Sequence, residues 1–396
     1  MGMASQKVVL VSNPGSASRK YGLYRGDEVL AKLHFEYEGG KVVCTTSAGS
    51  QKVTEPVAIE QLDQSTELVV QHLQAAKVLT QADDIEAIAI RIVAPSGYFL
   101  QHRVVDDDAV QHLESLARLA PLHINVALKE IKKLRTQFPS APLVAISDSK
   151  FHSTKPDYAW NYGISLRDAD TYDIKRYGFH GLSMAAACKS LRRADKLATK
   201  TVIAHLGSGA SVTAVHGGKS MDNTMGYSPL EGLVMATRSG TIDYSAIRAL
   251  QISTGMSSTE IETYLNTNSG LLGLGGSSDL RELLQREEAG DEQAALALRT
   301  YVYGVQKGIA QMAAALGGID ALVFTGTVGE RSAIIRKRVV ARLHYLDFYL
   351  DESVNMACLN PSGIETVSKL AQSKPVYVVA TDEATEIAYQ AAELIS

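Results

Sequence analysis

Short apolar runs alternate along the chain with longer segments in which apolar positions recur at helical spacing. The runs that predict strands, because they are short and rich in β-branched residues, are VVLVS, IEAIAIRIV, APLVAIS, TVIA, VTAV, DALVFTG and KPVYVVAT. The helical spacing predicts helices over 57–77, 105–118, 124–137, 290–316 and 382–395. Strands and helices that alternate in this way are typical of an α/β protein.

Two pairs of the predicted strands are joined by turns rich in glycine and serine. VVLVSNPGSASRKYGLYRGDEV near the N-terminus and TVIAHLGSGASVTAVHGGKSM near the middle each contain a strand, such a turn, a second strand and a second turn. When Ser18 is set against Ser211, the offset is 211 − 18 = 193 residues, about half of the 396-residue chain. A repeat at this spacing predicts two related α/β domains that hold a ligand from both sides.

The turn in the second of these segments, residues 205–211, has two interpretations. Glycine reaches positive φ without penalty, so an ordinary hairpin turn explains it. Its backbone N–H groups and serine hydroxyls are also the groups that bind a polyanion at close approach. This stretch by itself does not distinguish the two.

Composition excludes several classes of protein. The apolar fraction of 45% and the charged fraction of 21% are those of a folded chain, and a net charge of −4 gives no basic surface for nucleic acid. The three cysteines, Cys44, Cys188 and Cys358, are too dispersed for a disulfide framework or a zinc site. No apolar run is long enough to span a membrane, and MGMASQK does not resemble a signal peptide. We therefore expect a cytoplasmic protein without nucleic-acid or membrane partners.

Polar residues follow four of the predicted strands. Arg91, Asp148, the segment 326–330 and the pair Asp382-Glu383 stand at or after strand ends. Ligands of α/β proteins bind at such ends. Each residue alone could be a helix cap or a turn residue, but together they predict a ligand site.

These segments, taken together and in order, resemble the acetate kinase family, which belongs to the superfamily of acetate and sugar kinases, Hsp70 and actin. The motifs that carry the resemblance are SNPGSAS, RIV, LAPLH, SDSKFH, RYGFHG, HLGSGAS, DNTMGYSPLEGLVMATRSG, SSDLR, ALVFTGTVGER and VVATDEA. The resemblance implies two related actin-like (ribonuclease H-like) α/β domains with an interdomain cleft. Residues 1–150 would form the first domain, on which the C-terminal helix can pack back, and 151–396 the second, with the nucleotide site.

The activity implied by the resemblance is reversible phosphoryl transfer between ATP and acetate, giving acetyl phosphate and ADP. A carboxylate acceptor is already ionised, so the site needs positive charge and alignment rather than a general base. Arginine forks suit both the carboxylate and the transferring phosphoryl group. The implied catalytic residues are Arg91, Asp148, His180 and Arg238.

The resemblance also assigns binding residues. A small apolar acceptor pocket is implied for Val93, Leu122, Phe179 and Pro229. Nucleotide and phosphate binding are implied for Asn13, Ser16, Ser18, Lys20, His205, Gly207, Gly209, Asp279, Leu280, Arg281, Thr327, Val328 and Gly329. The implied cofactor is Mg²⁺ or Mn²⁺, held by Asn13 and Glu383 with Asp148, because such ions take few protein carboxylates beside phosphate oxygens and water. Most members of the family are homodimers.

The chain departs from the family pattern in three places. Residues 94–97 read APSG where the family usually has His-Gly-Gly, and Ser147, Ser149 and Lys150 replace Phe, Thr and Ala. In FTGTVGER, Thr327 replaces a glycine that lies against the nucleoside, and Arg331 replaces an asparagine. Three alternatives therefore stand beside an ATP-dependent acetate kinase: a kinase for propionate or another short carboxylate, a pyrophosphate-dependent acetate kinase, and a non-catalytic nucleotide-binding regulatory protein. The sequence leaves the physiological direction open.

Overall fold

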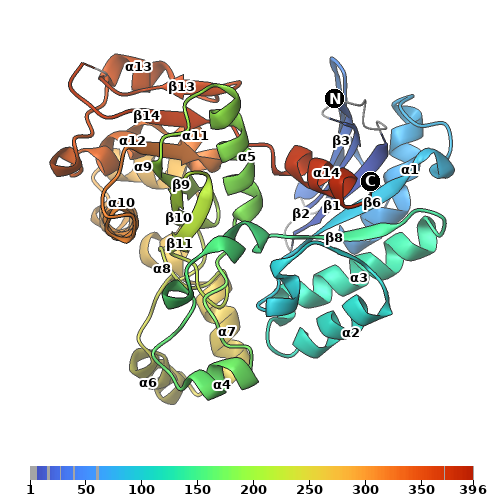
Figure 1. Ribbon diagram of the computed structural model, residues 1–396, viewed down its shortest axis with the longest axis horizontal. Helices are drawn as coiled ribbons and strands as arrows, with labels where there is room; N and C mark the ends of the chain where they lie inside the picture. Colours follow the sequence, from blue (N-terminus) through green and yellow to red (C-terminus); the bar gives the residue numbers. More distant parts are fainter. Residues whose placement is uncertain are drawn as a thin grey trace. The chain divides into compact units, whose positions relative to one another are not determined.

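The computed structural model describes residues 7–15, 18–26, 28–38, 41–58, 62–369 and 371–395, without the side chains of residues 38, 63, 83 and 122. The chain divides into two compact units (Figure 1). One unit is Met1–Lys150 together with Asp382–Ser396, and the other is Phe151–Thr381. The C-terminal segment therefore belongs with the first unit, and the second unit ends at Thr381.

The described residues of the first unit form an eight-stranded sheet in the order β5-β4-β3-β2-β1-β6-β8-β7. Its strands are β1 Val8–Pro14, β2 Ser18–Arg25, β3 Glu28–Glu38, β4 Lys41–Ala48, β5 Gln51–Pro56, β6 Ala87–Ile92, β7 Arg103–Val104 and β8 Leu143–Ser147. Strands β1, β6 and β8 run parallel, whereas β1 to β5 form an antiparallel meander. The carboxyl ends of the three parallel strands therefore share one edge of the sheet.

The helices of this unit include α1 Ser65–Ala75, α2 Asp107–Leu116, α3 Pro121–Gln137 and α14 Glu383–Leu394. Helices α3 and α14 pack on the parallel strands, whereas α1 packs on β3 and α3, and α2 packs on α3. The C-terminal helix α14, red in Figure 1, lies against β1 and β6. Consecutive residues of β1, such as Leu10 and Val11, point to opposite faces and are both fully buried, so both faces of the sheet are covered there.

In the second unit, the part that the structure describes forms a six-stranded sheet in the order β11-β10-β9-β12-β14-β13. Its strands are β9 Lys200–Leu206, β10 Ala210–His216, β11 Lys219–Asn223, β12 Ala321–Thr325, β13 Ile364–Thr366 and β14 Val376–Val379. Strands β9, β12 and β14 run parallel, and the other three run antiparallel to their neighbours. This is the order and direction of β3-β2-β1-β6-β8-β7 in the first unit. The predicted pair of related actin-like α/β domains is confirmed.

The helices of the second unit include α4 Leu166–Thr171, α5 Gly181–Arg193, α6 Tyr244–Thr254, α7 Ser258–Thr267, α8 Gly270–Gly275, α9 Leu280–Glu288, α10 Glu292–Ala315, α11 Gly326–Arg331, α12 Ala333–Val340 and α13 Glu352–Ala357. Some pack on the sheet, whereas others, such as α6, pack on another helix. Helix α10 packs on β9 and β10. Met184 and Leu191 of α5 join a separate core cluster with Ile203 and Val323 of the sheet. Within the described part of the chain, no helix is both long enough and apolar enough to cross a membrane.

Most predicted elements form, with two corrections. The predicted helix over 57–77 is too long, because the chain is still in β5 up to Pro56 and helix α1 begins only at Ser65. The proposed match of Ser18 with Ser211 is also wrong. Gly15 N–H donates to the carbonyl of Ser18 in the first turn, whereas Gly207 N–H donates to that of Gly209 in the second, both at 2.9 Å. The second turn is thus one residue shorter, and Ser18 corresponds to Gly209.

Candidate active site

The first unit holds a charged cluster at the shared edge of its parallel strands. Arg91 lies near the end of β6, Asp148 directly follows β8, and Glu383 is the first residue of α14. Arg91 Nε donates to Asp148 Oδ1 at 3.2 Å, and Nη2 lies 3.1 Å from the same oxygen. Arg91 Nη1 lies 3.4 Å from Glu383 Oε2. The structure thus brings together three residues that the sequence placed at three separate strand or helix ends.

The positive charge of Arg91 is stabilised by its surroundings. The Asp148 side chain is 1% exposed, and that of Arg91 19%. Burial opposes the positive charge of Arg91, but Asp148 and Glu383 outweigh this effect and hold the pKa of the guanidinium above its ordinary value. Arg91 therefore stays cationic at any accessible pH.

Two of the four predicted phosphate-binding residues of the first hairpin lie side by side in the structure. Asn13 and Lys20 are directly paired across β1 and β2, so their side chains share one face of the sheet. The carbonyl of Ser18 closes the turn, and Ser16 lies outside the described residues. Among the described contacts, no hydrogen bond joins Asn13 to Glu383, the other predicted metal ligand.

His180 occupies a strained position in the second unit. Its backbone is left-handed (φ 61°, ψ 22°) at the N-terminus of α5, a conformation that is uncommon for residues other than glycine. Its Nδ1 lies 2.9 Å from Ser211 Oγ, and its ring stacks on that of His205 with centroids 4.2 Å apart. Strain of this kind is found at functional sites more often than elsewhere.

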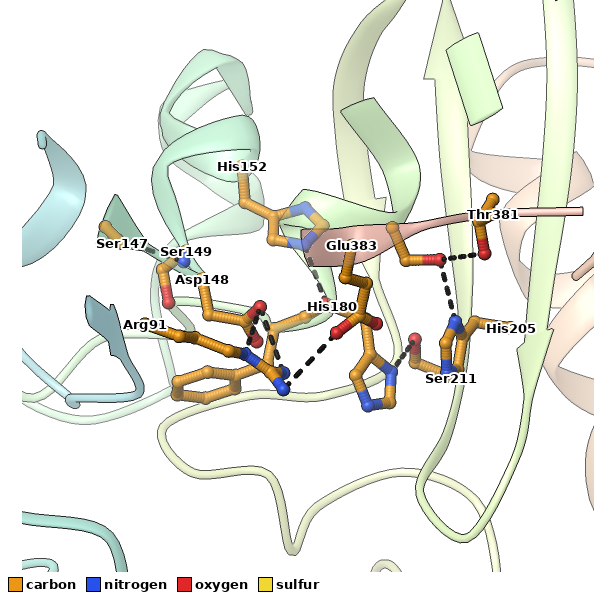
Figure 2. Close-up of polar contacts among 12 residues, drawn as sticks. Arg91, Ser147, Asp148, Ser149, His152, His180, His205, Ser211, Thr381 and Glu383 are labelled. Atoms are coloured by element: carbon orange, nitrogen blue, oxygen red, sulfur yellow. Dashed lines mark hydrogen bonds and ion pairs between the residues drawn. The ribbon is translucent and has the colours of Figure 1, made fainter. Parts of the chain in front are cut away.

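His205, at the end of β9, belongs to a chain of hydroxyl groups (Figure 2). Its Nδ1 lies 2.8 Å from Ser183 Oγ, which lies 3.4 Å from Thr381 Oγ1. Thr381 Oγ1 in turn lies 2.8 Å from Thr325 Oγ1, at the end of β12. The chain therefore connects His205 to the ends of the two neighbouring parallel strands. Sequence reasoning missed Ser183 and Thr381 because they lie 22 and 176 residues from His205 (205 − 183 and 381 − 205).

The glycine turn between β9 and β10 is where the predicted groups converge. A Cβ atom on Gly209 would lie 3.1 Å from His180 Nε2 and 3.5 Å from Arg238 Nη1. A Cβ atom on Gly207 would lie 3.6 Å from His205 Nε2 and 3.9 Å from the backbone nitrogen of Thr327. The absence of side chains at both glycines thus lets two imidazoles, a guanidinium and a backbone N–H approach the turn.

The predicted nucleotide loop forms α11, directly after β12. Gly326 is left-handed (φ 77°), and a Cβ atom there would lie 2.7 Å from the carbonyl oxygen of Leu206. Thr327 is exposed, Val328 is half-buried, and Gly329 is buried. The loop therefore starts against the end of β9, next to the glycine turn.

A buried arginine that the sequence did not reveal supports this loop. Arg336 of α12 is completely buried, and its Nη1 donates to the carbonyls of Gly329 at 2.8 Å and Glu330 at 3.0 Å. Its Nε donates to Asn355 Oδ1 at 2.8 Å, and its Nη2 to the carbonyl of Cys358 at 2.6 Å. Burial lowers the pKa of Arg336 below its ordinary value. A buried charge of this kind is stable only when its donors are satisfied.

The predicted acceptor residues have different environments. Phe179 is 1% exposed, and its carbonyl accepts a hydrogen bond from His152 Nε2 at 2.9 Å. Pro229 is buried, and its carbonyl accepts from Arg238 Nη1 at 3.4 Å. Val93, in the first unit, is half-buried. The side chain of Leu122 lies outside the described part of the structure.

An ionic and aromatic network holds the loop that carries Pro229. Arg176 Nη1 lies 2.5 Å from Glu231 Oε1, and the hydroxyl of Tyr162 donates to the same carboxylate. Tyr227 N–H donates to that hydroxyl at 2.8 Å. Arg176 and Glu231 belong to the motifs RYGFHG and MGYSPLEG, so the motifs signalled the position of this network but not the pairing within it.

The SSDLR segment forms a helix cap. Asp279 is the N-cap of α9, and its Oδ1 accepts from the backbone N–H of Arg281 at 2.8 Å. Arg281 Nη2 lies 2.7 Å from Asp279 Oδ2, and this contact lowers the pKa of the Asp279 carboxyl. Leu280 is buried, at 7% exposure. Asp279 therefore caps α9 in this structure, and its predicted role at the nucleotide stays a prediction.

The residues present fit a magnesium ion that is completed by other ligands. Across the described residues, no group of three or more His, Cys, Asp or Glu side chains gathers to hold a metal. Asp148 and Glu383 nevertheless contact the same guanidinium and offer carboxylate oxygens, the ligands that Mg²⁺ prefers. Magnesium commonly takes only one or two protein carboxylates when phosphate oxygens and water supply the rest.

Comparison with known proteins identifies the family of this chain. The model of the Acetokinase family matches residues 8–389. The chain belongs to the acetokinase family. It is 39% identical to an acetate kinase of Streptomyces avermitilis, over 98% of this chain and 97% of that protein.

Solved structures of the same family have the same fold. The crystal structure of a propionate kinase from Francisella tularensis superposes with a TM-score of 0.89 at 33% identity, covering 98% of this chain and 99% of that one. An acetate kinase from Porphyromonas gingivalis gives a TM-score of 0.85 at 31% identity, covering 98% and 100%. The acetokinase fold thus extends over essentially the whole chain.

The departures from the family pattern have clear local structures. In the segment 94–97, Ser96 Oγ accepts the N–H of Tyr98 at 3.2 Å and caps a short 3₁₀ helix over Gly97–Leu100. Lys150 is exposed. Arg331 donates from Nε to Asn360 Oδ1 at 3.1 Å at the surface.

Proposed function

We propose that this protein transfers a phosphoryl group reversibly between ATP and acetate, giving acetyl phosphate and ADP. The observation that carries this proposal is the convergence of His180, Arg238 and His205 on the glycine turn. Arg91, held between two carboxylates, supplies a second fixed positive charge. The acceptor is anionic and the transition state spreads charge over the phosphoryl oxygens, so this is the chemistry that needs two arginines.

The two imidazoles are arranged to donate rather than to act as bases. A serine hydroxyl contacts Nδ1 in each ring, Ser211 for His180 and Ser183 for His205. When each hydroxyl donates, Nδ1 accepts and the proton of a neutral ring resides on Nε2. His180 Nε2–H then stabilises the transferring phosphoryl group, and His205 Nε2–H binds the phosphate chain. The backbone N–H groups of the turn and of Thr327 add further donors for the nucleotide.

Asp148 and Glu383, with Asn13, would hold the divalent cation. When bound, Mg²⁺ neutralises charge on the phosphates. Arg91 forms an ion pair with each of the two carboxylates and so restricts their movement. The same arginine would orient the acceptor carboxylate for in-line attack.

The acceptor site is proposed to be small and apolar, from Val93, Leu122, Phe179 and Pro229. Acetate suits such a site best and propionate next, but one methylene is worth only about 1–3 kcal/mol. Propionate kinase activity therefore remains the second candidate, and the related structure from Francisella tularensis favours testing it. A protein that only binds nucleotide would not need Arg91, His180 and Arg238 together.

A steady-state assay of acyl phosphate formation tests the function. Acetate, propionate and butyrate are compared with Mg²⁺ and either ATP or GTP, and the reverse direction is run with acetyl phosphate and either ADP or inorganic phosphate. Highest kcat/KM for ATP and acetate supports the proposal. If the reverse reaction forms pyrophosphate but not ATP, the phosphoryl partner of the enzyme is pyrophosphate rather than a nucleotide. No transfer by a folded protein that binds ATP would favour the regulatory alternative.

We also propose a cytoplasmic homodimer. Within the second unit, helix α6 has no buried residue, and its Tyr244 and Ile252 are 73% and 74% exposed. Large apolar side chains exposed in this way favour association. Sedimentation velocity of the wild-type protein tests the oligomeric state, and a monomer at assay concentrations would contradict the proposal.

A further inference from the structure

One buried histidine of the first unit lies directly behind the charged cluster. His102 is 9% exposed and precedes β7. Its Nδ1 accepts the backbone N–H of Ser147 at 3.0 Å, and its Nε2 lies 3.1 Å from Gln390 Oε1. Ser147 is the residue before Asp148, and Gln390 lies on α14, the helix that begins with Glu383. His102 therefore joins the two elements that carry the carboxylates.

The tautomer of His102 follows from its partners. The Ser147 amide can only donate, so Nδ1 of His102 must accept. Gln390 Nε2 donates to Glu386 Oε1 at 2.7 Å, which turns Gln390 Oε1 toward His102 to accept from Nε2–H. Both ring nitrogens of a neutral imidazole are thus used. Burial and the nearby charge of Lys150 lower the pKa of His102 to about 4, so the ring is neutral at physiological pH.

Ser147 links the same strand end to a second segment. Its hydroxyl donates to the carbonyl of Phe99 and accepts the N–H of Ser149 at 3.1 Å. Backbone groups on both sides of Asp148 are therefore held by side chains rather than by sheet pairing alone. The Phe99–His102 segment is the common support for these bonds.

We propose that His102 is a positioning residue that fixes Asp148 relative to Glu383 and thereby sets the placement of Arg91 during turnover. The catalytic part of this inference rests on the proposed function. Partners one step behind a ligating or catalytic group typically contribute 10- to 100-fold to activity or metal affinity. His102 itself contacts neither carboxylate among the described contacts, so its effect passes through Ser147 and α14.

The test compares His102→Phe, which removes both bonds, with His102→Gln, whose amide can accept from Ser147 and donate to Gln390. His112→Phe is the control, because His112 is half-buried on α2, stacks on Tyr98 and makes no described hydrogen bond to Ser147 or Gln390. For each protein, kcat and KM with ATP, Mg²⁺ and acetate are measured together with the melting temperature. Amide hydrogen exchange is followed in peptides that cover 143–151 and 383–391.

We expect His102→Phe to lower kcat about tenfold or more, with a smaller change in KM, and to accelerate exchange in both peptides. His102→Gln should recover most of both effects, and His112→Phe should show neither. A His102→Phe protein with a lower melting temperature but the wild-type kcat would overturn the inference, because the role of His102 would then be structural only. Unchanged hydrogen exchange in both peptides would overturn the inference as well, and this readout does not need an active enzyme. An inactive wild-type protein would instead refute the proposed function.

Discussion

The two units present the ends of equivalent strands, yet the chemistry at those ends differs. In the first unit the residues are ionic, with Arg91 on β6 and Asp148 after β8. In the second they are His205 at the end of β9, Thr325 at the end of β12 and Thr381 after β14, joined through hydroxyl groups. The shared topology fixes where side chains meet, and the residue type decides whether they balance charge or donate hydrogen bonds.

This difference suits a reaction that needs both kinds of group. The carboxylates of the first unit hold an arginine and can ligate a cation. The uncharged hydrogen-bond donors of the second unit can bind phosphate oxygens without repelling the metal. Arg238 is the exception in the second unit, since it brings full charge to the glycine turn. The predictions below change one side of the comparison at a time.

Removing the charge from the second unit should have the largest effect. Arg238→Ala should lower kcat on the order of 10³-fold, because an arginine that stabilises the transferring phosphoryl group contributes at least that much. The melting temperature should change little. Arg299→Ala, an exposed arginine on α10, is the matched control. Near-normal turnover of a folded Arg238→Ala protein would remove Arg238 from the site.

The neutral histidine behind the charged cluster should make stability depend on pH. The pKa of His102 is about 4 in the folded protein against 6.5 ordinarily, so between these values the unfolded chain binds more protons. Stability therefore falls as pH decreases from 6.5 toward 4, by up to about 3 kcal/mol. Urea unfolding at pH 7 and pH 5 should show a smaller loss for His102→Gln than for the wild type. Equal losses would contradict this assignment.

Filling the glycine turn should separate the imidazoles from their target without unfolding the protein. In Gly209→Ala, the new methyl group would lie 3.1 Å from His180 Nε2, so the ring must move. We expect kcat to fall on the order of 10- to 100-fold, because small displacements at a reacting centre are costly. Gly163→Ala is the control, since a Cβ atom there meets nothing within 4 Å. Full activity of Gly209→Ala would show that the turn tolerates a side chain.

The smallest effect is expected at the nucleotide loop. Thr327→Gly removes an exposed β-branched side chain from the first turn of α11, which gives the nucleoside more room. The KM for ATP should fall a few-fold, about 1 kcal/mol in binding terms. The KM for acetate serves as the internal control and should not change. An increase in the KM for ATP would show that Thr327 makes a useful contact.

The sequence was a good guide wherever the signal was local. Apolar runs located β6, β8, β12 and β14, and strand-end positions indicated Arg91 and Asp148. The helix over 57–77 was overextended because Val57 and Ala58 continue an apolar pattern after β5 has ended. The match of Ser18 with Ser211 failed because the turn lengths depend on backbone hydrogen bonds that a pattern of residue types does not encode.

Residues with long-range partners could not be predicted in the same way. His102 bonds to Gln390, which is 288 residues away, and Arg336 bonds to carbonyls as well as to Asn355. Carbonyl acceptors leave no trace in residue identity, and a lone histidine or arginine in a sequence is most often simply a core or surface residue. Such roles become visible only when the fold brings the partners together.

The position of α14 has a consequence for synthesis of the protein. This helix follows the entire second unit in the chain, yet it covers β1 and β6 of the first unit and supplies Glu383 to Arg91. Translation runs from the N-terminus, so the face of the first sheet that α14 covers stays exposed until the second unit and α14 have left the ribosome. The domain that begins first is therefore completed after the second one, and the Arg91 cluster can form only once the second unit has been made.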